Sequence, residues 1–313
     1  MMGGGGGGGR SRSYSQQDVE AMRRAMEATR QAEGSRRLDS DVNRVLQDLL
    51  VDFNDHDTEE LRRRLRSIDE ALGDDVQFES FVLGGSVAKH TAVSGLSDVD
   101  ALLVFDRDSL EGNAPTDILN ECMHLLSERL SAADAVATRI GTLSVTVTYQ
   151  DGMEIQVLPA VRSGNEFAIP NSTGTGWRIT DPYAFRTRLT AANERLNFRL
   201  VPTIKVLKSL LTRLPEDQRL SGYHQEALSL ETTRNYDGPR TVKALLLHVL
   251  ENASGRVLEP VADVTGQNRF VDADLGPADS PTRRAVAASL AALARQLRSL
   301  TTAEQWRHAI AEE

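Results

Sequence analysis

A glycine-serine turn followed by two acidic residues at the start of an apolar strand constrains this chain more than any other segment. Residues 83–105 read Leu-Gly-Gly-Ser-Val-Ala-Lys-His-Thr-Ala-Val-Ser-Gly-Leu-Ser-Asp-Val-Asp-Ala-Leu-Leu-Val-Phe. Asp98 and Asp100 are two apart, and side chains two apart on a strand share a face. Two carboxylates at that spacing repel each other unless a cation lies between them. Because Mg²⁺ takes carboxylate oxygens together with substrate phosphates, the pair indicates a metal–nucleotide site.

The spacing of the two aspartates does not decide this by itself. An Asp-x-Asp pair is common, and in isolation Asp98 is more often a cap and Asp100 a solvated residue at a strand edge. The turn Gly84-Gly85-Ser86 supports the metal site, because it lies between a strand predicted over 78–83 and a helix predicted to begin near Ser86. Glycines let the backbone approach a phosphate, and a serine adds a hydroxyl donor.

A third carboxylate follows in a predicted hairpin. The segments 143–149 and 153–158 read as strands that turn at Asp151-Gly152. Glu154 alternates outward with Gln156, while the apolar residues between them face the other way. On a strand adjacent to the aspartates, Glu154 completes a three-carboxylate site for two metal ions.

Around this strand-rich middle the apolar spacing predicts helices. They cover 16–32, 39–72, 117–130, 200–214, 223–230, 242–250 and 283–297, and a further strand covers 99–105. Asp39 or Ser40 is the expected N-cap of the second helix and Gly73 its end. Strands followed by helices predict an α+β protein with two lobes and a cleft between them. We expect a disordered glycine-rich tail over 1–15, a core lobe with the N-terminal helices over 16–181, and a helical lobe over 182–313.

Composition narrows the class of protein. The 313 residues carry a formal net charge of −9, which argues against a protein that coats long nucleic acids or anionic membranes. A single cysteine, Cys122, excludes an intramolecular disulfide and a cysteine-rich zinc site. No apolar run approaches the roughly 20 residues that span a bilayer, and no signal-peptide core is present. We therefore expect a cytoplasmic protein.

Taken together, the turn, the aspartate pair and the third carboxylate resemble the DNA polymerase β-type nucleotidyltransferases over about residues 80 to 160. The helical half narrows the resemblance. Its Lys205-x-x-Lys208 helix, its Ser-Gly-Tyr-His turn at 221–224 and its Asp-Val-Thr-Gly-Gln-Asn loop at 263–268 resemble the cGAS/DncV-like nucleotidyltransferases, the CD-NTases of bacterial CBASS antiphage systems. This resemblance implies a polymerase β-like core with a mixed sheet, a C-terminal helical lobe and an active site in the cleft between them.

The resemblance also implies a role for individual residues. Gly85 and Ser86 would hold the phosphates of the donor nucleotide, and Lys208 would reach its triphosphate with Lys205 as a helper. Tyr223 would stack on a nucleobase. The aspartate pair would ligate two Mg²⁺ or Mn²⁺ ions, and Glu154 would bind the ion that activates the acceptor hydroxyl. Two positions depart from the family pattern, since Glu154 stands where Asp is usual and Gly222 where Ser is frequent.

The activity implied is a template-independent nucleotidyltransferase. It would make a cyclic di- or oligonucleotide from NTPs with release of pyrophosphate, and a downstream effector would respond to the product; a regulatory partner is also implied. Two alternatives keep the fold: transfer of nucleotides to RNA, tRNA or a protein, and a catalytically weak nucleotide-sensing module. On composition alone, Lys205 and Lys208 are ordinary surface lysines, and Tyr223 is as readily a packed aromatic.

Overall fold

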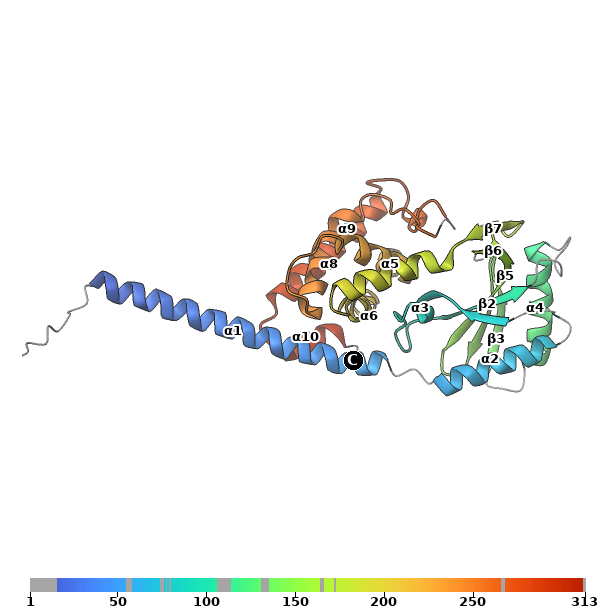
Figure 1. Ribbon diagram of the computed structural model, residues 1–313, viewed down its shortest axis with the longest axis horizontal. Helices are drawn as coiled ribbons and strands as arrows, with labels where there is room; N and C mark the ends of the chain where they lie inside the picture. The colour runs from blue at the N-terminus through green and yellow to red at the C-terminus, as the bar shows by residue number, and fades with distance from the viewer. Residues whose placement is uncertain are drawn as a thin grey trace, which may run out of the picture.

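A mixed seven-stranded sheet and a separate helical lobe make up the protein (Figure 1). The structure is a computed structural model, and it describes residues 16–54, 58–73, 76, 78, 80–105, 114–130, 135–163, 166–171, 173–265 and 268–311. The expected glycine-rich tail, 1–15, lies outside the described residues. The predicted α+β class, with a mixed sheet followed by C-terminal helices, is confirmed.

Two parallel central strands organise the sheet. The strands are β1 (Ser80–Leu83), β2 (Val99–Phe105), β3 (Ala135–Ile140), β4 (Val145–Tyr149), β5 (Glu154–Ser163), β6 (Glu166–Pro170) and β7 (Trp177–Thr180). Their order is β1-β2-β5-β4-β3, and β6 pairs with β5 and β7. Strands β2 and β5 run parallel, and every other pairing is antiparallel. The predicted hairpin is the β4–β5 pair, which turns at Gly152 with φ +85°.

Both faces of β2 are buried, and its alternation sets the direction of the aspartates. Ala101, Leu103 and Phe105 pack with α2 (Thr58–Leu72) and α4 (Pro115–Arg129). Leu102 and Val104 pack on the opposite face with β6. Asp98 and Asp100 share the parity of Leu102, so they lie on the face away from α2 and α4.

The helical lobe has its own core of leucine and valine side chains. Its helices are α5 (Pro182–Arg195), α6 (Leu200–Leu211), α7 (Gly222–Thr232), α8 (Val242–Arg256), α9 (Pro281–Ser299) and α10 (Ala303–Ile310). Short 3₁₀ turns, η3 (Glu216–Gln218) and η4 (Ala273–Leu275), lie between them. Among the described residues, no helix is both long and apolar enough to cross a membrane.

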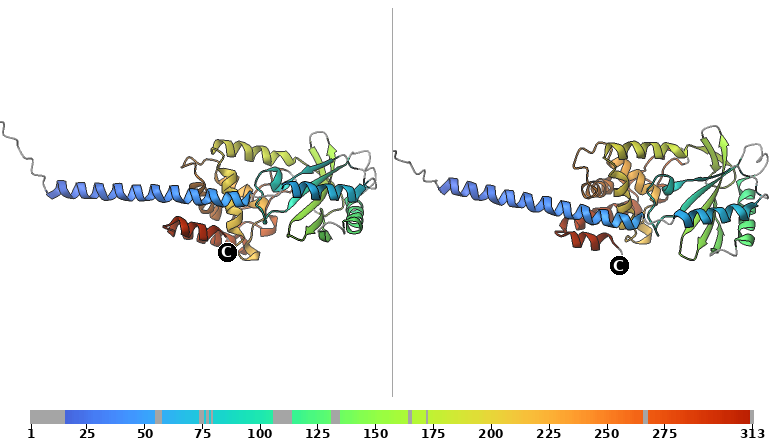
Figure 2. Two further views of the ribbon diagram at one scale, coloured as in Figure 1. Left: turned by 90° about the horizontal axis from the view of Figure 1, so that it is seen from below. Right: turned by 60° about the horizontal axis from the view of Figure 1, so that its bottom comes forward.

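The first helix differs from the prediction. A single helix, α1 (Gln16–Phe53), covers the first predicted segment and the first part of the second, so the expected N-cap at Asp39 or Ser40 is wrong. The prediction of one helix over 39–72 is also wrong, because the rest of that segment forms the separate helix α2 (Thr58–Leu72). Gly34 lies in the gap between the two predicted segments and lowers the helix propensity there by about 1 kcal/mol relative to alanine. The packed turns that follow offset this cost. Val42 and Leu46 of α1 pack into the helical lobe, although the sequence division groups this helix with the core lobe. The N-terminal half of α1 projects beyond the rest of the protein (Figure 2).

Candidate active site

The glycine-serine turn lies directly against the aspartate pair. Strand β1 ends at Leu83, and the four-residue helix α3 (Gly85–Ala88) begins two residues later. The N–H of Gly84 donates to the backbone carbonyl of Asp100 at 2.8 Å. Gly85 has φ +53°, and a Cβ on it would lie 1.5 Å from Asp100 Oδ2. Only glycine therefore lets the Asp100 carboxylate pack against the backbone of this turn.

The parallel pairing of β2 with β5 brings the third carboxylate to the same place. Asp100 lies opposite Gln156 in the register. Gln156 Nε2 donates to Asp98 Oδ2 at 3.0 Å, and Thr148 Oγ1 donates to Glu154 Oε1 at 3.1 Å. Glu154 is near enough to Asp98 for its charge to act on that carboxyl. The outward alternation predicted for Glu154 and Gln156 is confirmed.

The electrostatics of the aspartate pair favour a bound cation. Burial raises the pKa of Asp98, and the charge of Glu154 raises it further. Burial also raises the pKa of Asp100, with the charge of Lys89 opposing and the charge of Asp98 adding to the shift. A divalent cation relieves both the burial cost and the repulsion.

The donor set therefore fits Mg²⁺ or Mn²⁺ at the aspartate pair. Carboxylate oxygens are the ligands that these hard cations take together with substrate phosphates. Within the part of the chain that the structure describes, no group of three or more His, Cys, Asp or Glu side chains is arranged to hold a metal ion. The aspartates thus form the core of the candidate metal site, and Glu154 as a third ligand stays a prediction.

Three cavities meet at the carboxylates. The larger cavity, of about 810 Å³, is lined by Asp98, Glu154 and Lys205 among others. A second cavity of about 340 Å³, here called the Lys208 cavity, holds most of the predicted site: Gly85, Ser86, Asp98, Asp100, Lys208 and Tyr223. A third, also of about 340 Å³ and here called the aromatic cavity, shares Gly85, Asp100 and Tyr223 with the second. Asp98 is common to the larger cavity and the Lys208 cavity.

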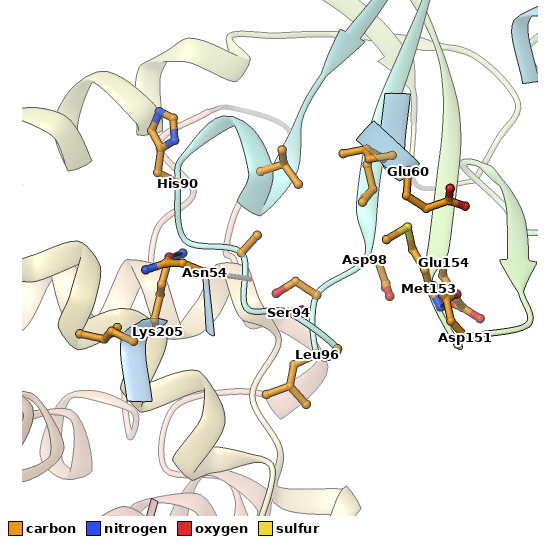
Figure 3. Close-up of a pocket in the computed structure, with 18 of the residues that line it drawn as sticks. Asn54, Glu60, His90, Ser94, Leu96, Asp98, Asp151, Met153, Glu154 and Lys205 are labelled. Carbon is orange, nitrogen blue, oxygen red and sulfur yellow. Dashed lines mark hydrogen bonds between the residues drawn. The ribbon is translucent and has the colours of Figure 1, made fainter. Parts of the chain in front are cut away.

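The two lysines of α6 face different cavities. Lys208 Nζ donates to the carbonyl of Thr91 at 3.1 Å and to Glu226 Oε1 at 2.9 Å. Lys205 Nζ instead donates to Asn54 Oδ1, just beyond the end of α1. Figure 3 shows Lys205 and Asn54 across the larger cavity from Asp98. Both lysines are buried, so neither is the surface lysine that composition suggested.

Tyr223 is held by the late loop that the sequence singled out. Its hydroxyl donates to Asp263 Oδ1 at 2.7 Å, and Asp263 also accepts from the N–H groups of Thr265 and Asn268. Its ring meets Phe185 edge-to-face with centroids 4.9 Å apart. Burial raises the pKa of Tyr223. The ring borders both the Lys208 cavity and the aromatic cavity.

Two ionisable residues at this site were missed from the sequence. Lys89 and Glu226 both line the Lys208 cavity. Lys89 stands three residues after Ser86, one helical turn, and that spacing was a usable signal. Glu226 follows the polar pair His224-Gln225 in α7, so no signal in the sequence indicated that its carboxylate would be buried.

This geometry defines a class of protein, a nucleotidyltransferase with its carboxylates between a sheet and a helical lobe. The comparisons with known proteins place it more narrowly. Residues 37–193 match the SMODS family model, described as "Second Messenger Oligonucleotide or Dinucleotide Synthetase domain". The chain belongs to this family. The resemblance to CD-NTases and the enzyme class inferred from it are confirmed.

Solved structures share the fold along most of the chain. CdnC from E. coli MS115-1 with ATP matches with a TM-score of 0.61 and 13% identity, covering 87% of this chain and 96% of CdnC. The complex titled CdnC:HORMA-deltaN, from the same strain, matches with a TM-score of 0.58 and 12% identity, covering 80% of this chain and 90% of the matched chain. The Bradyrhizobium diazoefficiens CD-NTase CdnG with GTP matches with a TM-score of 0.61 and 15% identity, covering 86% of this chain and 95% of CdnG. Among curated protein sequences, none matches this chain significantly.

Proposed function

We propose that this synthetase joins two nucleoside triphosphates across the aspartate pair and then closes the product into a cyclic di- or oligonucleotide. The observation that carries the proposal is that Asp98 borders both the larger cavity and the Lys208 cavity. A nucleotide in each cavity brings an acceptor hydroxyl and a donor phosphate to the same carboxylates. The volume of the larger cavity is within the range of small-molecule sites.

The donor nucleotide is assigned to the Lys208 cavity. Gly85 and Ser86 offer backbone and hydroxyl donors to its phosphates, Lys208 offers a buried ammonium, and Tyr223 offers a ring face to its base. Lys205 borders the larger cavity, so its cation serves the nucleotide bound there. ATP, GTP or pyrimidine triphosphates all carry the phosphates that these groups bind.

Glu154 is the proposed base for the acceptor. The hydroxyl of the acceptor nucleotide attacks the α-phosphorus of the donor, the bond to the leaving pyrophosphate breaks, and the hydroxyl proton passes to Glu154. The hydrogen bond that Thr148 donates to one oxygen of Glu154 fixes the orientation of this carboxylate. Asp98 and Asp100 would hold two Mg²⁺ or Mn²⁺ ions with Glu154, and such ions supply charge neutralisation and an acidified hydroxyl.

The cellular setting is part of the same proposal. We place the enzyme in the cytoplasm, where NTPs are available, in an antiphage system whose downstream effector responds to the nucleotide product. The complex titled CdnC:HORMA-deltaN supports a regulatory protein partner for this chain as well. We also propose a division at residue 181 into a core lobe and a helical lobe, with α1 packed on the helical lobe.

The test is product analysis. The full chain is incubated with four labelled NTPs and Mg²⁺ or Mn²⁺, treated with phosphatase, and analysed by mass spectrometry. We expect a phosphatase-resistant product that disappears in Asp98→Asn and Asp100→Asn. Asp279→Asn is the matched control, since it removes an exposed carboxylate paired with Arg284 and leaves the site untouched.

Three outcomes would contradict the proposal. Incorporation only when RNA, tRNA or a protein is added would indicate the transferase alternative. Thermal stabilisation by NTPs without pyrophosphate release would indicate the sensing alternative. Full activity in Asp100→Asn would remove the metal assignment.

A further inference from the structure

A fully buried carboxylate connects the two lobes beside the Lys208 cavity. Glu226 of α7 is 0% exposed. Its Oε2 lies 2.5 Å from Lys89 Nζ, and its Oε1 accepts from Lys208 Nζ at 2.9 Å and from Thr91 Oγ1 at 2.5 Å. Lys89 and Thr91 follow the glycine-serine turn of the core lobe, whereas Glu226 and Lys208 belong to the helical lobe.

The charges in this cluster depend on one another. Burial raises the pKa of Glu226, but the charges of Lys89 and Lys208 outweigh burial and hold its pKa below the ordinary value. Burial lowers the pKa of Lys208, and Glu226 opposes that shift. Without this carboxylate, the two ammonium groups would keep the charge of Asp100 nearby but lose the anion that contacts both of them, which is unfavourable in a buried place.

The cluster also faces the parts of the site that would hold a nucleotide. Lys89, Lys208 and Glu226 line the same cavity as Ser86. Lys89 Nζ lies 5.0 Å from the ring centroid of Tyr223 and is 12% exposed, so it stands between the aromatic wall and the phosphate-binding turn. Glu226 thus fixes two cations that approach the cavity from different lobes.

We propose that Glu226 is a positioning residue for triphosphate binding, which holds Lys89 and Lys208 as a pair of cations directed at the phosphates beyond the α-phosphate. The inference rests on the proposed function, because it assigns the Lys208 cavity to the donor nucleotide. Lys89 becomes a second phosphate-binding cation of this cavity, and Glu226 acts through the two lysines and touches no substrate.

The test separates phosphate binding from general damage. Binding to full-length protein is measured by calorimetry with Mg²⁺ and the α,β-methylene triphosphates of the four ribonucleosides, and again with the four monophosphates. For Glu226→Gln we expect about a tenfold to hundredfold loss for the triphosphate and less than about a twofold change for the monophosphate, the scale of losing charge-assisted contacts. Glu231→Gln is the matched control. Glu231 also belongs to α7, and the substitution removes its ion pair with Arg256 of α8.

A second set of variants identifies the route of the effect. Glu226→Asp retains the charge, so its loss of triphosphate affinity should be smaller than that of Glu226→Gln. If Glu226→Gln does not fold, the affinity of Glu226→Asp is the measurement that tests the proposal. Adding Glu226→Gln to Lys208→Met should weaken triphosphate binding by less than the product of the two single effects, since both act on one cluster.

Opposite results would overturn the inference. Equal losses for triphosphate and monophosphate, or losses in the double variant that multiply, would make Glu226 a purely structural ion pair. Unchanged triphosphate binding in Glu226→Gln would remove the positioning role while leaving the proposed function intact. A wild-type protein that binds no triphosphate would overturn both.

Discussion

Substituting Gly85 by alanine tests the geometry of the carboxylates most directly. A Cβ at this position would lie 1.5 Å from Asp100 Oδ2. Because non-bonded heavy atoms keep about 3.5 Å apart, the carboxylate must retreat by about 2 Å. The residue also has φ +53°, where a side chain costs about 1–2 kcal/mol.

The expected result is a large loss of activity with a small loss of stability. A displacement of about 1 Å in a reacting group lowers a rate by about a hundredfold, so kcat should fall at least that far. The backbone strain should lower Tm by only a few degrees. The measurements are the initial rate of pyrophosphate release at saturating NTP and thermal denaturation of the same preparation.

Gly73→Ala provides the matched control. Gly73 has φ +54°, and its added Cβ would meet only the side-chain end of Arg129, at 3.4 Å. The control should therefore show the same fall in Tm and wild-type activity. A folded Gly85→Ala protein that keeps more than about a third of the wild-type kcat would refute the reasoning that Asp100 must pack on this turn.

Three further predictions concern charge and stacking. Burial raises the pKa of Asp100 above its unfolded value, so the metal-free protein loses stability as pH rises through that raised pKa. Asp100→Asn should therefore raise Tm in EDTA at neutral pH while abolishing product, and an unchanged Tm would contradict this. Tyr223→Ala should raise KM for the triphosphate by about fivefold to a hundredfold, whereas Tyr223→Phe should stay within about fivefold, and equal effects would refute a stacking role. Burial lowers the pKa of His224 to about 4, so the free energy of unfolding should fall as pH drops from about 6.5 towards 4. Denaturant unfolding of His224→Gln should show a weaker fall over this range, and the same pH dependence in both proteins would contradict the prediction.

Local patterns predicted the part of the fold that carries the chemistry. The alternation around Asp98 and Glu154, the hairpin at Gly152 and the helix end at Gly73 all follow from the backbone geometry of a few consecutive residues. These features need no distant contact, because strand alternation and positive φ are properties of the local chain.

Elements stabilised by distant contacts were harder to predict. Strands β3, β6 and β7 and helices α5 and α10 were not identified, since their short segments gain their structure from pairing and packing partners elsewhere in the chain. The continuity of α1 has the same origin, because Val42 and Leu46 pack into the helical lobe and support the helix past Gly34. Arg64 stands in a run of three arginines in α2, yet it is buried and donates to the carboxylate of Asp151.

The sequence by itself determined which chemical groups are present and their local order: a glycine-serine turn, a pair of aspartates on one strand face, a third carboxylate, two lysines one turn apart and a tyrosine at a helix start. Only the tertiary structure decided that Lys205 and Lys208 serve different cavities and that Glu226 joins Lys89 to Lys208. The physical reason is that spacing along a strand or helix fixes the relative direction of nearby side chains. The packing of the sheet lobe against the helical lobe fixes which distant charges meet.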